Sequence, residues 1–193
     1  MFDQPSQICF QLPSWLAEFA ATYQTSTDPV EQMKFVLAAA RENVQRETGG
    51  PFAAAIFVAD SGDLVALGVN LVTTQGLSAL HAEMVAIAVA QRKLGSYDLS
   101  LNKGALRLVC STEPCAMCLG AIPWSGVRQV VTGARDEDAR AIGFDEGTKP
   151  DDWSASLTKR GISVHTDILR QQAREILHRY QKQVGTIYNV GSP

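Results

Sequence analysis

The sequence predicts an α/β fold, a three-layer α/β/α sandwich around a mixed five-stranded sheet. Two neighbouring strand-like segments, residues 53–59 and 64–70, are separated by a short turn, which is typical of an antiparallel hairpin. Beyond this hairpin, helical and strand-like segments alternate, as in folds whose parallel strands are covered by helices on both faces. The length of 193 residues suits one domain of this kind.

Two helices are expected before the hairpin. Apolar side chains recur at helical spacing between residues 12 and 23, and again between residues 33 and 44. Asp28 is placed to cap the second helix, Pro29 suits its first turn, and Glu31 lies three residues beyond the cap, as in a capping box. We therefore expect residues 1–27 to form a helical extension and residues 28–193 to form the main domain.

The later elements follow one another in alternation. A helix over residues 79–94 is nearly apolar in its first part, so it is expected to be buried. The next predicted elements are a strand over 105–110, a short helix over 115–122, a strand over 127–134 and a fifth strand over 163–166. A last helix over residues 167–184 carries an apolar stripe and precedes a tail, residues 185–193.

Charge and hydropathy limit the partners and the compartment. The chain has 17 basic and 20 acidic residues, for a net charge of −3, which disfavours a general nucleic-acid binder. The longest apolar run, residues 52–59, is far shorter than the roughly 20 residues of a membrane helix. The first basic residue is Lys34, so the N-terminal segment lacks the basic region of an export signal. We expect a cytoplasmic protein with reduced cysteines.

Two motifs predict a metal centre. His81-Ala82-Glu83 opens the buried helix, and Pro114-Cys115-Ala116-Met117-Cys118 opens the next one. Because side chains three residues apart on a helix are neighbours, Cys115 and Cys118 can hold one metal ion between them. With His81 they supply three ligands and leave a fourth position for water, which is typical of a catalytic zinc site. Glu83 lies next to the metal without binding it, so it is the candidate proton carrier.

A Cys-x-x-Cys pair also occurs in redox centres and in structural zinc sites. A zinc-stabilised binding module, the non-enzymatic alternative, would need a fourth protein ligand. Cys110 could supply one, but its place in an apolar strand predicts a core residue. Cys9 is expected to be a residue of the N-terminal segment without a role in the site. The two motifs together favour an enzyme.

The pattern of His-x-Glu followed by Pro-Cys-x-x-Cys resembles that of the zinc-dependent nucleobase deaminases of the cytidine deaminase superfamily. Finer motifs resemble those of bacterial guanine deaminases, namely residues 49–54, Asn70, residues 72–74, residues 113–122 and residues 143–146. The resemblance implies a cytidine deaminase-like fold and the hydrolytic deamination of guanine to xanthine and ammonia. It also implies that His81, Cys115 and Cys118 bind Zn²⁺ and that Glu83 carries the proton.

The resemblance further implies the residues that bind the nucleobase. In guanine deaminases an asparagine reads the purine, an acidic residue after a Gly-Phe pair accepts hydrogen bonds from ring N–H groups, and the C-terminal tail enters the partner's site in a domain-swapped homodimer. By position these are Asn70, Glu146 and the tail with Tyr188. The remaining candidates are Ala82 and three aromatic residues, for which core packing is the alternative: Phe52, Trp124 and Phe144.

Other deaminations are open at the level of sequence. Ammeline, an aminotriazine, presents an amino-substituted carbon between ring nitrogens as guanine C2 does, so the same pocket could accept it. A tRNA adenosine deaminase shares the metal motifs, and residues 159–182 hold six basic residues against two acidic ones. A solvated helix face is the simpler explanation of that basic segment. Cytosine deamination is a third alternative, because the size and shape of the pocket cannot be derived from the sequence.

Overall fold

A computed structural model, which describes residues 4–183 and 185–189, contains one five-stranded sheet in the order β2-β1-β3-β4-β5. Its strands are β1 (Ala53–Val58), β2 (Leu64–Val69), β3 (Leu106–Thr112), β4 (Gln129–Ala134) and β5 (Ser163–His165). β1 is antiparallel to both β2 and β3, whereas β3, β4 and β5 are parallel. The predicted mixed sheet is therefore confirmed.

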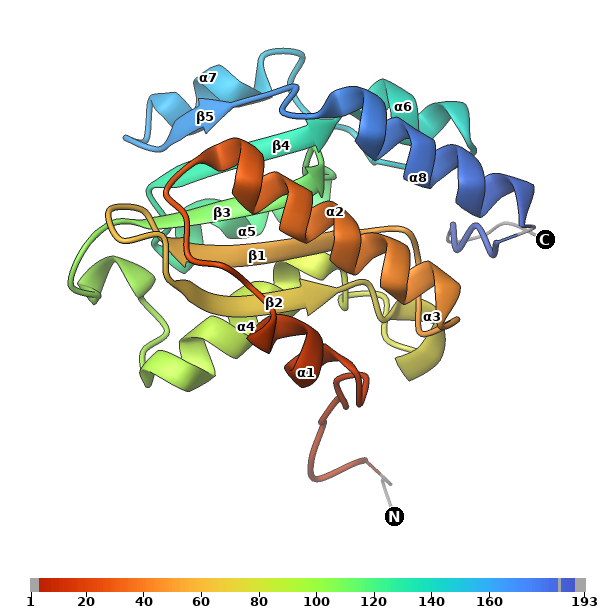
Figure 1. Ribbon diagram of the computed structural model, residues 1–193, viewed down its shortest axis with the longest axis horizontal. Coiled ribbons are helices and arrows are strands. Elements are labelled where there is room, and N and C mark those ends of the chain that lie inside the picture. Colours follow the sequence, from red (N-terminus) through yellow and green to blue (C-terminus); the bar gives the residue numbers. More distant parts are fainter. Residues whose placement is uncertain (1–3, 184, 190–193) are drawn as a thin grey trace.

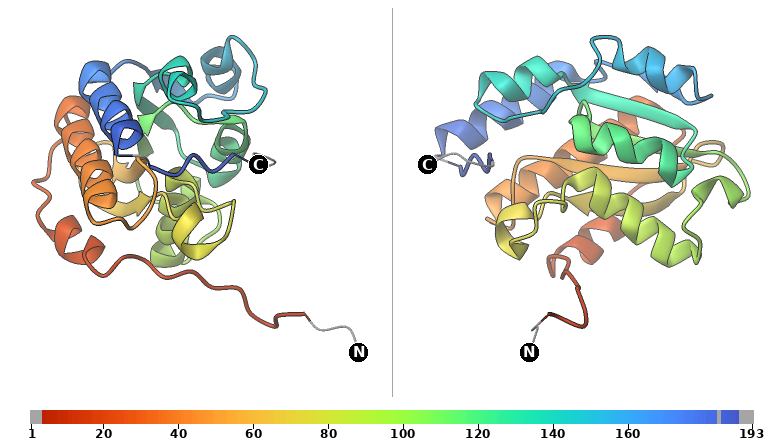
Figure 2. Two further views of the ribbon diagram at one scale, coloured as in Figure 1. Left: turned by 90° about the vertical axis from the view of Figure 1, so that its right-hand side faces the viewer. Right: turned by 180° about the vertical axis from the view of Figure 1, so that it is seen from behind.

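Helices cover both faces of this sheet (Figures 1 and 2). The helices are α1 (Leu16–Ala21), α2 (Pro29–Gln45), α3 (Val72–Gln75), α4 (Ala82–Leu94), α5 (Ala116–Ser125), α6 (Asp136–Ala141), α7 (Trp153–Thr158) and α8 (Arg170–Lys182), with a 3₁₀ turn at Leu99–Leu101. In Figure 1, α2 and α8 lie in front of the sheet, and the view from behind in Figure 2 shows α4 and α5 on the other face. The predicted three-layer sandwich is confirmed.

The side chains of the central strands alternate between two cores. Ala55, Phe57 and Val109 pack with α2 and α8, whereas Ile56 and Leu108 pack with α4 and α5. Successive residues of a strand point to opposite faces, so strands covered on both sides are apolar throughout. The central strands are thus buried on both faces, and the site described below lies at the ends of β1, β2 and β3.

The N-terminal helices differ in detail from the prediction. Asp28 caps α2 by accepting a hydrogen bond from the backbone N–H of Val30. The expected capping box is wrong, because the N–H of Asp28 donates to Ser26 Oγ and Glu31 pairs with Lys34 at 2.6 Å. The first helix is shorter than its apolar spacing suggests and spans six residues. A proline in its expected first turn, Pro13, favours extended backbone at the residue before it.

Other boundaries shift by a few residues. The buried helix α4 starts at Ala82 rather than 79, because His81 is its extended N-cap. The helix α5 continues through Pro123 and ends where Gly126 adopts a φ of +86°. Its C-cap needs a glycine, because a Cβ at position 126 would lie 2.5 Å from Asp98 Oδ1. Within the described residues, every helix is too short or too polar to cross a membrane.

Candidate active site

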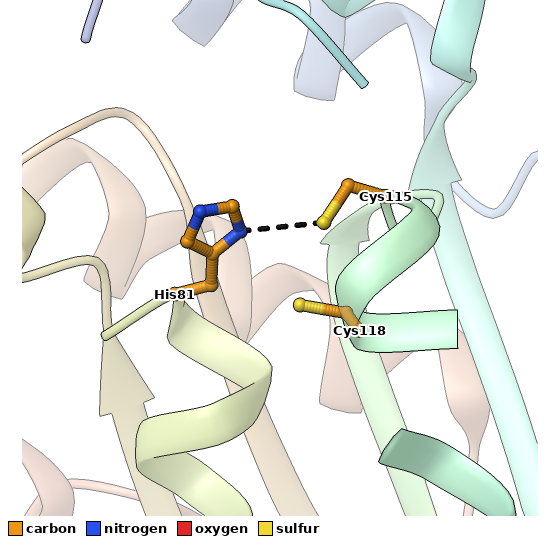
Figure 3. A group of neighbouring side chains, drawn as sticks. All are labelled: His81, Cys115 and Cys118. Carbon is orange, nitrogen blue, oxygen red and sulfur yellow. Dashed lines mark hydrogen bonds between the residues drawn. The ribbon is translucent and has the colours of Figure 1, made fainter. Parts of the chain in front are cut away.

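His81, Cys115 and Cys118 converge between the first turns of two helices (Figure 3). His81 is the N-cap of α4, Cys115 is the N-cap of α5, and Cys118 lies one turn further along α5. The candidate ligand atoms of these side chains all lie within 4.8 Å of one another, and His81 Nδ1 is 3.4 Å from Cys115 Sγ. Two sulfurs and one imidazole nitrogen are a donor set that zinc prefers, so the residues fit this metal.

The charge of the sulfur atoms also suits a cation. The hydrogen bond with Cys118 lowers the pKa of the Cys115 thiol to about 4, against the opposing effect of burial, and the contact with His81 lowers it further. A thiolate is the form of cysteine that binds metals. Cys110 is not a member of the ligand group among the described residues and is buried in the core behind the cavity, as predicted.

Glu83 is buried in the first turn of α4, two residues after His81. Burial raises the pKa of its carboxyl above the ordinary value, and the nearby Cys115 raises it further. A carboxyl with a raised pKa takes up and releases protons nearer to neutral pH, which suits a general acid and base.

A cavity of about 360 Å³ opens beside the metal ligands. It lies at the ends of β1, β2 and β3 and at the start of α5. Most of the site residues predicted from the sequence line this cavity: Phe52, Asn70, His81, Glu83, Cys115, Phe144, Glu146 and Tyr188. The fold thus brings together residues that are far apart in the chain.

Asn70 presents a free hydrogen-bond donor to this cavity. It is 1% exposed, and its Oδ1 accepts from the backbone N–H of Val72 at 3.2 Å. Its Nδ2 is buried and has no partner in the described residues. Because an unpaired buried donor is costly, this amide is suited to a ligand acceptor.

The backbone of Asn70 is fixed by a second asparagine. The side chain of Asn43 on α2 is fully buried and donates to the carbonyl oxygens of Gly50 at 2.8 Å and Asn70 at 3.0 Å. Gly49 permits this close approach, because a Cβ there would lie 1.8 Å from the Asn70 oxygen. Asn43 was not among the predicted site residues, although a polar residue on an apolar helix face is a signal for such a role.

Glu146 lies across the cavity on the loop that follows α6. It is 7% exposed, and burial raises the pKa of its carboxyl to about 8, with the nearby Cys115 and Glu83 adding to this effect. Its carbonyl oxygen accepts from the N–H of Ala116 at 2.9 Å, which ties this loop to the start of α5. A buried carboxyl here can exchange hydrogen bonds with the polar edge of a ligand.

The C-terminal tail covers the cavity of its own chain, as far as residues 185–189 describe it. The Tyr188 ring lies 5.0 Å from the Phe144 ring and 6.3 Å from the His81 ring, between ring centres. Asn189 accepts from the N–H of Asp145 at 2.9 Å and donates to the Gly143 carbonyl at 2.7 Å. Sequence analysis missed Asn189. The remaining tail positions of the prediction, residues 190–193, and position 184 lie outside the described residues.

Two predicted substrate contacts lie outside the cavity. Trp124 is 84% exposed on the outer surface of α5; it follows Cys118 by six residues, which places the two side chains about 120° apart around the helix. Ala82 is the first residue of α4, is 1% exposed and packs against β2, where its carbonyl oxygen would lie 2.5 Å from a Cβ at Gly68. Neither side chain lines the cavity of this single chain, and their assignment as substrate contacts stays a prediction. Phe52 and Phe144 do reach it and pack edge to face at 5.0 Å.

Comparison with known proteins agrees with this geometry. The model of the cytidine and deoxycytidylate deaminase zinc-binding region matches residues 27–134, which include His81, Glu83 and both cysteines of the ligand group. The chain belongs to this deaminase family. Its cofactor is zinc, and the ligand group is the one that the two motifs predicted.

The deaminase is similar to guanine deaminases over most of its length. It is 40% identical over 114 residues to the guanine deaminase of Bacillus subtilis, which covers 59% of this chain and 69% of that protein. The solved structure of guanine deaminase from Nitrosomonas europaea is 42% identical, with a TM-score of 0.88 over 94% of this chain and 100% of that one. A further solved structure, a complex with 2,6-diaminopurine, is 45% identical, with a TM-score of 0.87 over 94% and 96% of the two chains.

Relatives that act on tRNA match over a shorter segment. The tRNA-specific adenosine deaminase of Haemophilus influenzae is 36% identical over 89 residues, 46% of this chain and 49% of that protein. The predicted resemblance to guanine deaminases is therefore confirmed by similarity along nearly the whole chain, and the tRNA enzymes are more distant.

Proposed function

We propose that the protein catalyses the hydrolytic deamination of guanine to xanthine and ammonia. The observation that carries this proposal is a fold and sequence shared with guanine deaminase along 94% of the chain, at 42% identity. The shape of the site supports it, because a cavity of about 360 Å³ is at the small end of ligand pockets and suits a free nucleobase.

Asn70 and Glu146 would orient the purine. The free Nδ2 of Asn70 is suited to a ring acceptor, and the Glu146 carboxyl in its ionised form is suited to accept from the N–H groups of the ring. Held by both, guanine presents C2 rather than C6 to the ligand group. Phe52 and Phe144 provide apolar walls for the ring.

Glu83 would move the protons of the reaction. When zinc is bound, it acts as a Lewis acid that lowers the pKa of a water molecule to about 7. Glu83 takes a proton from the attacking water, and C2 of guanine becomes tetrahedral as the C–O bond forms. Glu83 delivers this proton to ring N3, then takes the second proton from the new hydroxyl on C2 and passes it to the leaving amine, so that the C–N bond breaks, the C2=O bond forms and ammonia departs. Water is consumed, and the products are xanthine and ammonia.

The test is ammonia release from free guanine, adenine, cytosine, cytidine and ammeline at equal concentrations. We expect guanine to be the best of the four natural compounds. A higher kcat/KM for cytosine or adenine than for guanine would overturn the proposal.

Ammeline tests the breadth of the same pocket. We propose that it is also deaminated, because its amino-substituted carbon lies between two ring nitrogens as C2 of guanine does. The Asn70 donor can meet an acceptor on either ring. Activity on guanine without any ammonia release from ammeline would restrict the enzyme to purines.

A tRNA adenosine deaminase is the second candidate, and charge pairing weighs against it. The basic segment that favoured RNA carries Arg170 and Arg174, and both pair with the buried Asp138 at 2.8 and 3.0 Å. Arg170 and Arg174 share the charge of Asp138, and Arg170 also pairs with Glu137, so the two arginines have less free charge to offer to phosphates. Inosine formation in tRNA at a rate comparable to guanine deamination would favour this second function.

We also propose that the enzyme works in purine catabolism in the cytoplasm as a homodimer with exchanged tails. A reducing compartment keeps thiols such as Cys115 and Cys118 available for zinc. The contacts that Tyr188 and Asn189 make in the single chain are the contacts that a partner's tail would make after exchange.

A further inference from the structure

Lys149 places a positive charge beside the candidate active site, on the loop between α6 and α7. Its side chain is 8% exposed. Burying an ammonium group costs several kcal/mol unless the charge is paired and hydrogen-bonded. The partners of this lysine therefore indicate what it stabilises.

These partners belong to several segments that surround the metal ligands. Lys149 Nζ lies 2.8 Å from Asp136 Oδ1 at the start of α6, and it donates to the carbonyl oxygen of Pro114 at 2.9 Å. It also lies 5.6 Å from the centre of the Trp153 ring and 4.0 Å from Glu113 Oε2. Pro114 directly precedes the metal ligand Cys115, so the lysine contacts the peptide that carries this ligand.

Asp136 connects the same lysine to the loop of Glu146. Arg140 donates to Asp136 Oδ2 at 2.5 Å and to the carbonyl oxygen of Gly147 at 2.6 Å. The N–H of Asp136 donates to Glu113 Oε2 at 3.0 Å. These acidic and basic side chains form one ion-pair cluster, which Arg140 extends to Asp145 at 3.8 Å, and it joins the ends of β3 and β4 to residues 145–149.

We propose that Lys149 is a positioning residue, which holds the Cys115 end of α5 and the Glu146 loop in one fixed relation. A single ammonium group would then fix the relative positions of a metal ligand, Cys115, and a substrate-binding carboxyl, that of Glu146. The proposal rests on the proposed function only for the identity of the substrate. Residues that orient metal ligands typically change metal affinity or activity by about 10- to 100-fold when removed.

Lys149→Met tests the proposal, because methionine keeps the length of the side chain and removes its charge and donor. We expect zinc transfer to a chromogenic chelator about tenfold faster than in the unaltered enzyme, and a KM for guanine raised by a similar factor. Lys149→Arg, which retains a positive charge and donors, should recover part of both.

Lys93→Met is the matched control. Lys93 also donates to a backbone carbonyl, that of Val65 at 2.9 Å, but it lies in the last turn of α4, remote from the metal ligands. The Lys93→Met substitution removes a comparable hydrogen bond and should leave the rate of zinc transfer and the KM for guanine unchanged. Equal zinc-transfer rates and equal KM values in the two methionine variants would show that Lys149 is merely structural and overturn the proposal.

A second variant covers the case in which Lys149→Met does not fold. Lys149→Gln keeps a donor for the Pro114 carbonyl and removes the charge, and it is measured against Lys93→Met in the same way. Zinc transfer does not depend on the substrate. The two proposals can therefore fail separately. If the unaltered enzyme released no ammonia from guanine but Lys149→Gln lost zinc rapidly, the proposed function would be contradicted and the role of Lys149 supported.

Discussion

Single side chains around the cavity differ in charge because their surroundings differ. Burial raises the pKa of Glu83, and it raises that of Glu146 to about 8, whereas the Cys118 hydrogen bond lowers the pKa of Cys115 to about 4. Negative charge is therefore concentrated on a sulfur that binds the metal. Burial favours the protonated form of both carboxyls relative to an exposed glutamic acid, which suits a proton carrier at Glu83.

Replacing Glu83 by alanine should abolish turnover and leave the metal in place. Glu83 is not a member of the ligand group, so the zinc content measured on the purified variant should equal that of the unaltered enzyme. Removal of a general acid and base typically costs about 10²- to 10⁴-fold in rate. Ammonia release above a hundredth of the unaltered rate would contradict the role of Glu83.

Gly50→Ala should weaken substrate binding by displacing the tail. A Cβ at position 50 would lie 2.9 Å from the Tyr188 hydroxyl and 3.1 Å from Asn70 Oδ1, both of which are closer than normal contact. We expect KM for guanine to rise several-fold, with zinc content unchanged.

The matched control is Gly120→Ala in α5. No atom lies within 4 Å of a Cβ added at that position, and alanine favours a helix over glycine by about 1 kcal/mol. Its KM should not change and its melting temperature should rise. A KM for Gly50→Ala equal to that of this control would show that Tyr188 does not contact the substrate.

At the scale of elements, α6 and α8 are joined by one buried carboxylate. Asp138 accepts from Arg170 at 2.8 Å and from the N–H of Arg135 at 2.8 Å, and Arg174 lies 3.0 Å away. These contacts explain why a six-residue helix without an apolar period is ordered at this place. They also explain the orientation of α8 over the sheet.

Asp138→Asn should destabilise the fold in a pH-dependent way. Burial alone would raise the pKa of Asp138, but the Arg170 and Arg135 hydrogen bonds outweigh it and hold the pKa below 3.8. The stabilisation is present at pH values above the unfolded pKa of about 3.9, and it is lost as the pH falls through the lower folded value. Hydrogen bonds to charged groups contribute about 2 kcal/mol each, so we expect a loss of this size at pH 7.

The measurement is urea unfolding of Asp138→Asn and the unaltered chain at pH 7 and below pH 4. The difference between them should shrink at the lower pH. Asp151→Asn, at an exposed position, is the control and should unfold like the unaltered chain at both pH values. A difference that grew on acidification would contradict the assigned direction of the Asp138 pKa.

At the scale of the whole molecule, the proposed exchange of tails can be tested by mixing two inactive variants. Glu83→Ala lacks the proton carrier, and Tyr188→Ala lacks the tail contact. In a heterodimer with exchanged tails, the site that retains Glu83 receives an intact tail from the partner. Unfolding and refolding the two together should therefore restore up to about a quarter of the unaltered activity, if chains pair at random in dimers.

Each variant refolded alone is the control for this experiment. Activity of the mixture equal to the mean of the two controls would mean that each tail closes the site of its own chain, as residues 185–189 do in the single chain.

Local patterns were sufficient for the strands, the long helices and the metal ligands. The hairpin was predicted from two strand-like segments around a short turn, α2 from its helical apolar period and α4 from its nearly apolar first part. By contrast α3, α6 and α7 span only four to six residues each, too few to show a helical period. The helix α6 is stabilised by the ion pairs of Asp138 with α8, whereas α7 is capped by its own Asp152.

The sequence by itself determined the zinc ligands and the fold class, since ligand spacing and hydrophobic period are local properties of the chain. Only the tertiary structure decided that Trp124 faces outward, that Asn70 keeps a free donor, and that Lys149 joins two segments of the site. These depend on which buried groups find partners far away in the chain. The hydrogen-bond partners and the burial of a group depend on packing in three dimensions, whereas the spacing of metal ligands and apolar residues is a property of the sequence.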